Sequence, residues 1–189
     1  MAETSSPDPV LLIVAAFSHH PEALAWARHR LEELFGPVGL TSQVYDFDQT
    51  TYYEPSMGAG LRKQFLAFHN LIAADRLPDI KLHTNAMELE LTQADRYSEP
   101  RPLNLDPGIL SLGKFMLATT KDQAHRIYLR DGIYAEVTLR FQAGNFEPWP
   151  WTYADYRLPL VGDFLQEARD FYRRRLNASK LLPEPQERG

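Results

Sequence analysis

The chain has 189 residues, a formal net charge of −5 and no cysteine. This length suits one domain with a core of its own. Without cysteine there are no disulfides, zinc–thiolate sites, iron–sulfur clusters or cysteine nucleophiles. No window approaches the roughly 20 apolar residues of a membrane span, and the acidic balance argues against nucleic-acid binding.

The ends of the chain differ in composition from its middle. We expect a flexible tail over residues 1–9, one globular domain over 10–178 and a second flexible tail over 179–189, which is polar and rich in proline. The first nine residues carry acids where a signal peptide carries bases, so we expect a cytoplasmic protein.

The first elements predict a strand, a helix and a second strand. Residues 10–17 form a continuous apolar run, which is typical of a strand buried on both faces. Pro21 suits the first turn of a helix that Gly36-Pro37 ends. Residues 41–48 predict the next strand. Since a helix joins the two strands, we expect them to be parallel.

The middle of the chain gives mixed signals. Apolar residues at helical spacing predict a helix from Ser56 to Ile72. Residues 80–93 fit both alternation and helical spacing; their second part favours a helix, and the strand stays open as an alternative. Residues 101–106 predict a strand, which Asp106-Pro107-Gly108 would end as a turn. Another strand is predicted over 114–119.

The clearest pattern is a hairpin that turns at residues 130–132. A three-residue loop with glycine would pair Leu129 with Ile133 and Ile127 with Ala135, which keeps one face apolar. A helix over 160–176 follows. Together these elements predict one α/β or α+β domain, with helices on a mixed sheet of about six strands that has a βαβ start and a C-terminal antiparallel hairpin.

Sequence motifs exclude some activities. Gly58–Lys63 lacks the GxxxxGK[ST] pattern of a phosphate-binding loop, and Thr120-Lys121-Asp122 lacks the spacing of a guanine-specificity motif, so we reject a GTPase. Asp46 and Asp48 share one side of a strand end and could hold a hard cation, but solvated acids are the simpler interpretation. We predict no metal site.

Polar residues gather on the face of the hairpin opposite its apolar side. Arginine can clamp an anion, glutamate can act as a base, and histidine can transfer protons near neutral pH. We therefore predict ligand-binding residues Lys121, Arg126, Tyr128, Tyr134, Thr51, Tyr52 and Asn104, and candidate catalytic residues His125, Glu136 and Asp106. The structural alternative is a cross-strand ion pair between Arg126 and Glu136, with the tyrosines packed on it.

Several polar segments together resemble a known family. They are Thr51–Glu54, Asn104–Gly108, Leu117–Lys121, His125–Leu129, Gly132–Leu139 and Trp151–Tyr156. Their pattern is similar to the domain-of-unknown-function family 4416, a family of small prokaryotic proteins, from Val10 to about Leu176. The resemblance implies no particular activity.

The expected function is binding of a small anionic or phosphorylated ligand at a polar face of the sheet, and whether the protein also acts on that ligand is left open. The alternative is a non-catalytic interaction module that uses the loop 146–156, which is rich in proline and tryptophan. Nucleic acid is not an expected partner. The sequence does not determine a cofactor or an oligomeric state.

Overall fold

The computed structural model describes residues 3–181 and contains nine strands in one sheet. The strands are β1 (Val10–Ser18), β2 (Val38–Thr41), β3 (Tyr45–Asp46), β4 (Arg62–Ile72), β5 (Asn104–Leu110), β6 (Lys114–Thr119), β7 (Ile127–Arg130), β8 (Ile133–Gln142) and β9 (Asn145–Pro148). The helices are α1 (Pro21–Phe35), α2 (Glu54–Met57), α3 (Leu77–Gln93) and α4 (Pro159–Leu181), with short 3₁₀ turns η1 (Ala74–Arg76) and η2 (Ala154–Arg157).

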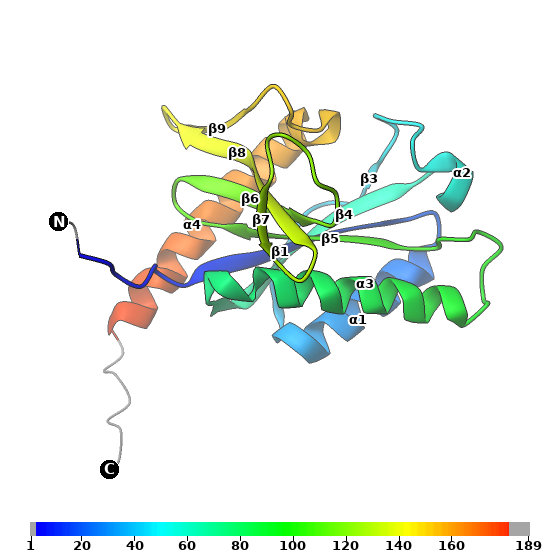
Figure 1. The fold of residues 1–189 in the computed structure, drawn as a ribbon, viewed down its shortest axis with the longest axis horizontal. Coiled ribbons are helices and arrows are strands. Elements are labelled where there is room, and N and C mark those ends of the chain that lie inside the picture. Colours follow the sequence, from blue (N-terminus) through cyan, green and yellow to red (C-terminus); the bar gives the residue numbers. More distant parts are fainter. Residues whose placement is uncertain (1–2, 182–189) are drawn as a thin grey trace, which may run out of the picture.

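The strand order is β2-β4-β1-β5-β6-β8-β7, with β3 beside β4 and β9 beside β8. Every pairing is antiparallel. Helices α1 and α3 lie along one side of the sheet (Figure 1), and α4 packs on the opposite face. The predicted α+β class is confirmed, but the sheet is larger than expected and not mixed.

The expected strand over residues 41–48 is replaced by two short strands, β2 and β3. Both run in the same direction as β1, yet neither is its neighbour in the sheet. β4 lies between β1 and β2, and β1 lies between β4 and β5. The units β1-α1-β2 and β4-α3-β5 are therefore split βαβ units, as in ferredoxin-like folds. β1 is buried along its whole length, as expected, because helices cover both faces of the sheet there. α1 begins at Pro21 and ends before Gly36, also as expected.

The predicted helix over residues 56–72 is wrong. α2 ends at Met57 after one turn, and β4 occupies residues 62–72. β4 is a central strand with apolar residues on both faces: Leu66 and Phe68 contact the core beneath α1 and α3, while Phe65 and Ala67 contact the core beneath α4. A strand buried on both sides has a continuous apolar run, which periodicity cannot distinguish from a helix.

Two other expectations concern the residues of α3 and β5. Residues 80–93 lie in α3, so the helical alternative is confirmed. The predicted turn at Asp106-Pro107-Gly108 is wrong, because β5 continues through it to Leu110. Gly108 allows β5 and β6 to approach each other closely there, because a Cβ at this position would overlap the backbone oxygen of Met116 in β6.

The hairpin of β7 and β8 keeps the expected register at Ile127–Ala135 and Tyr128–Tyr134, but its turn is tighter. Arg130 pairs with Ile133, so the predicted Leu129–Ile133 pair is wrong. The two turn residues between them both have positive φ, and the extra residue is absorbed as an irregularity in β7.

The last helix is longer than predicted, and its residues Leu165, Ala168 and Tyr172 are buried in the core beneath it. Residues 179–181 of the expected tail belong to α4, and residues 182–189 lie outside the described part of the chain, as do residues 1–2 of the other tail. Within residues 3–181, no helix has the length and apolar character needed to cross a membrane.

Candidate functional site

The site begins where β5 and β6 separate. Their pairing covers only Gly108–Leu110, whereas β5 stays paired with β1 as far as Asn104. In the unpaired part, the backbone N–H of Leu105 donates to Glu88 Oε1 at 2.7 Å, and its carbonyl accepts from Lys81 Nζ at 2.8 Å. Two side chains of α3 thus take the place of a neighbouring strand and hold the gap open.

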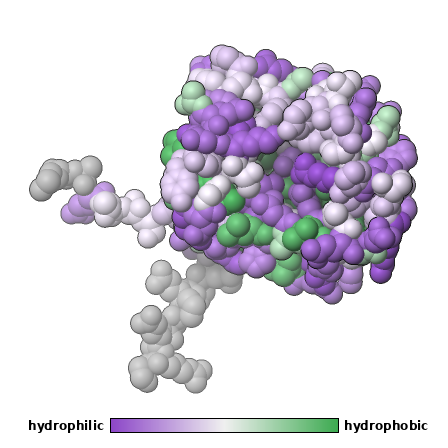
Figure 2. Space-filling model, turned by 45° about the vertical axis from the view of Figure 1, so that its right-hand side comes forward, coloured by the Kyte–Doolittle hydropathy of each residue, from purple (hydrophilic) through white to green (hydrophobic). Residues whose placement is uncertain are grey.

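A cavity of about 450 Å³ lies at this gap. It opens at the end of the sheet where β1 and β6 end and β4 and β5 begin. Residues of the segments 47–53, 117–123 and 153–156 line it. The space-filling view shows this side of the molecule hollowed, with both hydrophilic and hydrophobic side chains around the opening (Figure 2).

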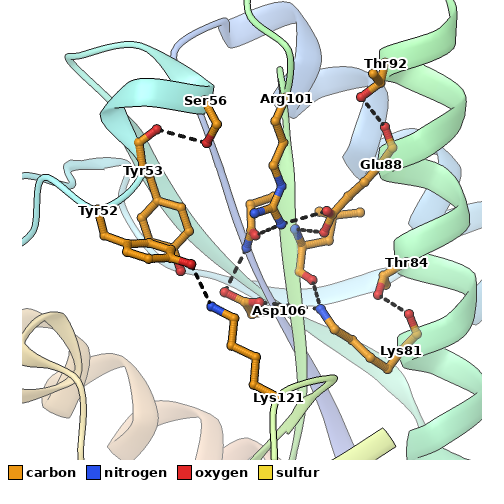
Figure 3. A network of polar contacts seen from close by, with 12 residues as sticks. Tyr52, Tyr53, Ser56, Lys81, Thr84, Glu88, Thr92, Arg101, Asp106 and Lys121 are labelled. Atoms are coloured by element: carbon orange, nitrogen blue, oxygen red, sulfur yellow. Dashed lines mark hydrogen bonds and ion pairs between the residues drawn. The ribbon is translucent and has the colours of Figure 1, made fainter. Parts of the chain in front are cut away.

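A chain of polar contacts crosses one wall of the cavity (Figure 3). Arg101 donates to Glu88 Oε2 at 2.8 Å and to the side-chain oxygen of Asn104. Asn104 Nδ2 in turn donates to Asp106 Oδ2 at 2.8 Å. Since Arg101 requires an acceptor and Asp106 a donor, only one orientation of the Asn104 amide satisfies both. The network therefore fixes the Asp106 carboxylate in place.

Glu88 is the buried anchor of this network. Burial raises the pKa of its carboxyl, and the nearby charges of Lys81 and Arg101 oppose that rise.

The deep end of the cavity contains a buried ion pair. Lys63 Nζ lies 2.7 Å from Asp155 Oδ2, and both side chains are almost fully buried. The ammonium also lies 4.7–5.5 Å from the ring centroids of Phe17, Phe47, Phe65 and Tyr156. Its charge is therefore balanced by a carboxylate and by the faces of aromatic rings.

Lys121 lies at the mouth of the cavity, and its surroundings differ from those of Lys63. Its ammonium donates to Tyr52 Oη at 3.0 Å and lies 4.7 Å from the centre of that ring. The hydrogen bond from Lys121 lowers the pKa of the Tyr52 phenol. Within residues 3–181, no carboxylate lies within ion-pair distance of Lys121.

Arg126 and Glu136 form a buried pair at the cavity wall, in which Glu136 lines the cavity and Arg126 lies behind it. Arg126 Nε donates to Glu136 at 2.8 Å, and each side chain is only 1% exposed. The remaining guanidinium nitrogens donate to the backbone oxygen of Lys121 at 3.0 Å and to Tyr153 Oη at 2.7 Å. The face of the hairpin that we expected to be open is therefore covered here, because the segment 149–156 packs over it.

The structure brings some of the predicted site residues together and separates others. Those that line the cavity are Tyr52, Asn104, Asp106, Lys121 and Glu136. His125 and Arg126 both contact Glu136 from behind the wall.

The other predicted residues lie away from the cavity. Tyr128 and Tyr134 pack edge to face against each other on β7 and β8, with 57% of Tyr128 exposed. Thr51 is exposed and does not line the cavity. Asp46 pairs with Arg62 at 3.1 Å. No three histidine, aspartate or glutamate side chains of the described residues come close enough to hold a metal ion.

Sequence reasoning missed the residues that build the deep wall: Lys63, Lys81, Glu88, Tyr153 and Asp155. One signal was available. Lys81 and Glu88 are seven residues apart, which places two charges on the same face of α3 as its apolar residues. No comparable signal marked Lys63, because its strand was assigned to a helix.

The loop that we considered as an interaction surface is occupied by contacts within the chain. Trp149 and Trp151 stack at 5.2 Å, and His125 stacks on Trp151 at the same distance. Trp151 Nε1 also donates to the backbone oxygen of Val137 at 3.1 Å. Beside this stack lies an apolar groove, in which Ile127 is 70% exposed.

Comparison with known families gives one match, and it covers residues 8–172. The matching family is described as a domain of unknown function, DUF4416. The chain belongs to this family. Searches among curated proteins and among solved structures gave no significant match. Family membership therefore confirms the resemblance found in the sequence and assigns no activity to the cavity.

Proposed function

We propose that the cavity binds a small anionic molecule, with Lys121 as its main charged contact. The observation that carries this proposal is the pairing of the cations in the wall. Lys63 pairs with Asp155, Lys81 lies near Asp106, and Arg101 pairs with Glu88. Lys121 has only the phenol of Tyr52 as a side-chain partner among the described residues.

A cation that faces a cavity without a carboxylate partner attracts an anion from solution. The guanidinium of Arg101, although paired with Glu88, is 36% exposed and lines the same cavity. The volume of the cavity lies within the range of small-molecule sites. Carboxylates and phosphates both satisfy this arrangement, since each accepts charge-assisted hydrogen bonds.

Binding of inorganic phosphate and pyrophosphate tests the proposal by calorimetry at low ionic strength. We expect saturable binding to the wild-type protein that weakens roughly 10-fold or more in Lys121→Gln, because a charged hydrogen bond is lost. Lys114→Gln is the matched control: Lys114 is an exposed lysine of the same strand region and does not line the cavity.

Two results would refute the proposal. One is the absence of saturable binding of either anion at millimolar concentration. The other is an equal loss of affinity in the Lys121 and Lys114 variants, which would indicate a general effect of charge.

The anion site is favoured over an interaction module. The tryptophans of the loop 146–156 are engaged with His125, Val137 and each other, and Arg140 lies 4.7 Å from the ring centre of Trp149. These contacts explain the aromatic residues as a cover for the Arg126–Glu136 pair.

A further inference from the structure

The cavity contains a carboxylate that anion binding alone does not explain. Asp106 lines the same cavity as Lys121, forms a long ion pair of 3.6 Å with Lys81 through Oδ1, and has 27% of its side chain exposed. A negative group there repels a bound anion, and the interaction is stronger in a partly enclosed site than in water. A site that served only to attract charge would gain affinity from a neutral side chain at this position.

The two oxygens of Asp106 have different environments. Oδ2 accepts a hydrogen bond from Asn104 Nδ2 at 2.8 Å. Oδ1 lies 3.6 Å from Lys81 Nζ, which is beyond hydrogen-bond length, and the Lys81 ammonium already donates to the carbonyl of Leu105. Oδ1 therefore retains unused capacity to accept hydrogen bonds at the cavity surface.

An ionised carboxylate only accepts hydrogen bonds, so its complement on a ligand is a donor such as a hydroxyl group. The contacts through Asn104, Arg101 and Glu88 hold Asp106 in a fixed orientation (Figure 3), which lowers the entropic cost of such recognition. Aromatic rings of Tyr52 and Tyr53 form part of the same cavity and offer a surface for the carbon skeleton of a ligand.

From this juxtaposition we infer that the ligand is a hydroxylated anion of the sugar-phosphate class, whose anionic group meets Lys121 and whose hydroxyl groups donate to Asp106. This inference rests on the proposed function, and it adds the chemical class of the ligand and the residue that selects it.

The test compares phosphate esters that differ in their hydroxyl groups. Glycerol 3-phosphate and propyl phosphate have the same chain length, while ribose 5-phosphate and inorganic phosphate extend the series. We expect the wild-type protein to bind glycerol 3-phosphate roughly 10-fold or more tightly than propyl phosphate, and ribose 5-phosphate roughly 10-fold or more tightly than inorganic phosphate, as measured by calorimetry.

The variant Asp106→Asn gives the sharper result, because only the hydroxylated probe should lose affinity. The asparagine side chain retains an oxygen for Asn104 but loses the negative charge. We expect weaker binding of ribose 5-phosphate and unchanged or stronger binding of inorganic phosphate. Asp163→Asn, which removes a charge from an exposed position on α4, should leave both affinities unchanged.

The outcomes separate this inference from the proposed function. If no anion binds to the wild-type protein, the proposed function fails and the inference fails with it. If phosphate binds through Lys121 but hydroxylated esters bind no more tightly, only the inference is wrong. Binding of ribose 5-phosphate that requires Mg²⁺ and is lost with a chelator would also overturn it, since Asp106 would then serve a cation. Thermal melts confirm that each variant is folded.

Discussion

The charged residues inside this protein differ in how their charges are compensated, and Arg126 and Glu136 form the most deeply buried ion pair of the described residues. Both side chains are 1% exposed. We expect Arg126→Ala or Glu136→Ala to lose roughly 3–5 kcal/mol of unfolding free energy, because each leaves a charge buried without its partner. Denaturant titrations measure this loss.

The double variant distinguishes buried scaffolding from a surface that serves a ligand. It should lose less than the sum of the two single variants, since no charge is then stranded. Arg140→Ala is the control, because Arg140 and Glu147 form an exposed pair at 2.9 Å whose loss costs about 0–1 kcal/mol. If both single variants lose little unfolding free energy, the pair is not buried scaffolding, and Arg126 would again be a candidate ligand-binding residue, as the sequence predicted.

Glu88 should make stability depend on pH. Burial raises the pKa of Glu88 in the folded protein. At pH values between the pKa of the unfolded state and that of the folded state, the folded protein therefore still binds a proton that the unfolded protein has released. The unfolding free energy of the wild-type protein should therefore fall, relative to Glu88→Gln, as the pH rises above roughly 4.3, the ordinary pKa of glutamate. Denaturation at a series of pH values measures the difference.

Glu167→Gln provides the comparison for that series, because Glu167 is an exposed glutamate on α4. A difference that instead grows in favour of the wild-type protein with rising pH would contradict the expectation. It would mean that Arg101 and Lys81 stabilise the carboxylate by more than burial destabilises it.

At the scale of elements, the separation of β5 and β6 decides the shape of the site, and Gly108 marks its start. A Cβ at Gly108 would overlap the backbone oxygen of Met116 and lie 2.8 Å from the ring of Phe115. We expect Gly108→Ala to lose roughly 1–3 kcal/mol, because the two strands must move apart. Chemical denaturation measures the change.

Gly113→Ala is a suitable control for this prediction. Gly113 lies between the same two strands, its φ is not positive, and an added Cβ meets no atom within 4 Å. Its substitution should change stability by less than about 0.5 kcal/mol. Equal effects of the two substitutions would show that the close contact at Gly108 is not a constraint.

At the scale of the whole molecule, the fold argues against nucleotide binding of the phosphate-loop type. Such a site needs a glycine-rich loop whose N–H groups and lysine surround the phosphates at the start of a helix. In this chain Gly58 ends the one-turn helix α2, and Lys63 is buried against Asp155. Calorimetry with GTP or ATP and Mg²⁺ should show no saturable binding at micromolar concentration, and clear binding there would contradict this view.

The sequence by itself determined the features that depend on neighbouring residues. α1 is bounded by Pro21 and Gly36 because their backbone preferences start and stop helices. The register at Tyr128–Tyr134 follows from alternation, since a shift by one residue would exchange the faces of the hairpin. Family membership was also readable from local segments, and the profile match confirms it.

Only the tertiary structure decided the features that depend on distant partners. β4 is a strand because β1 and β2 flank it and helices cover both of its faces, although its apolar spacing also fits a helix. Likewise, Lys81 and Glu88 bond to the backbone of Leu105, 24 and 17 residues away, because β6 leaves β5 unpaired there. Such contacts leave no periodic trace in the sequence, since the free energy that selects them comes from burial and hydrogen bonding between segments that meet only after folding.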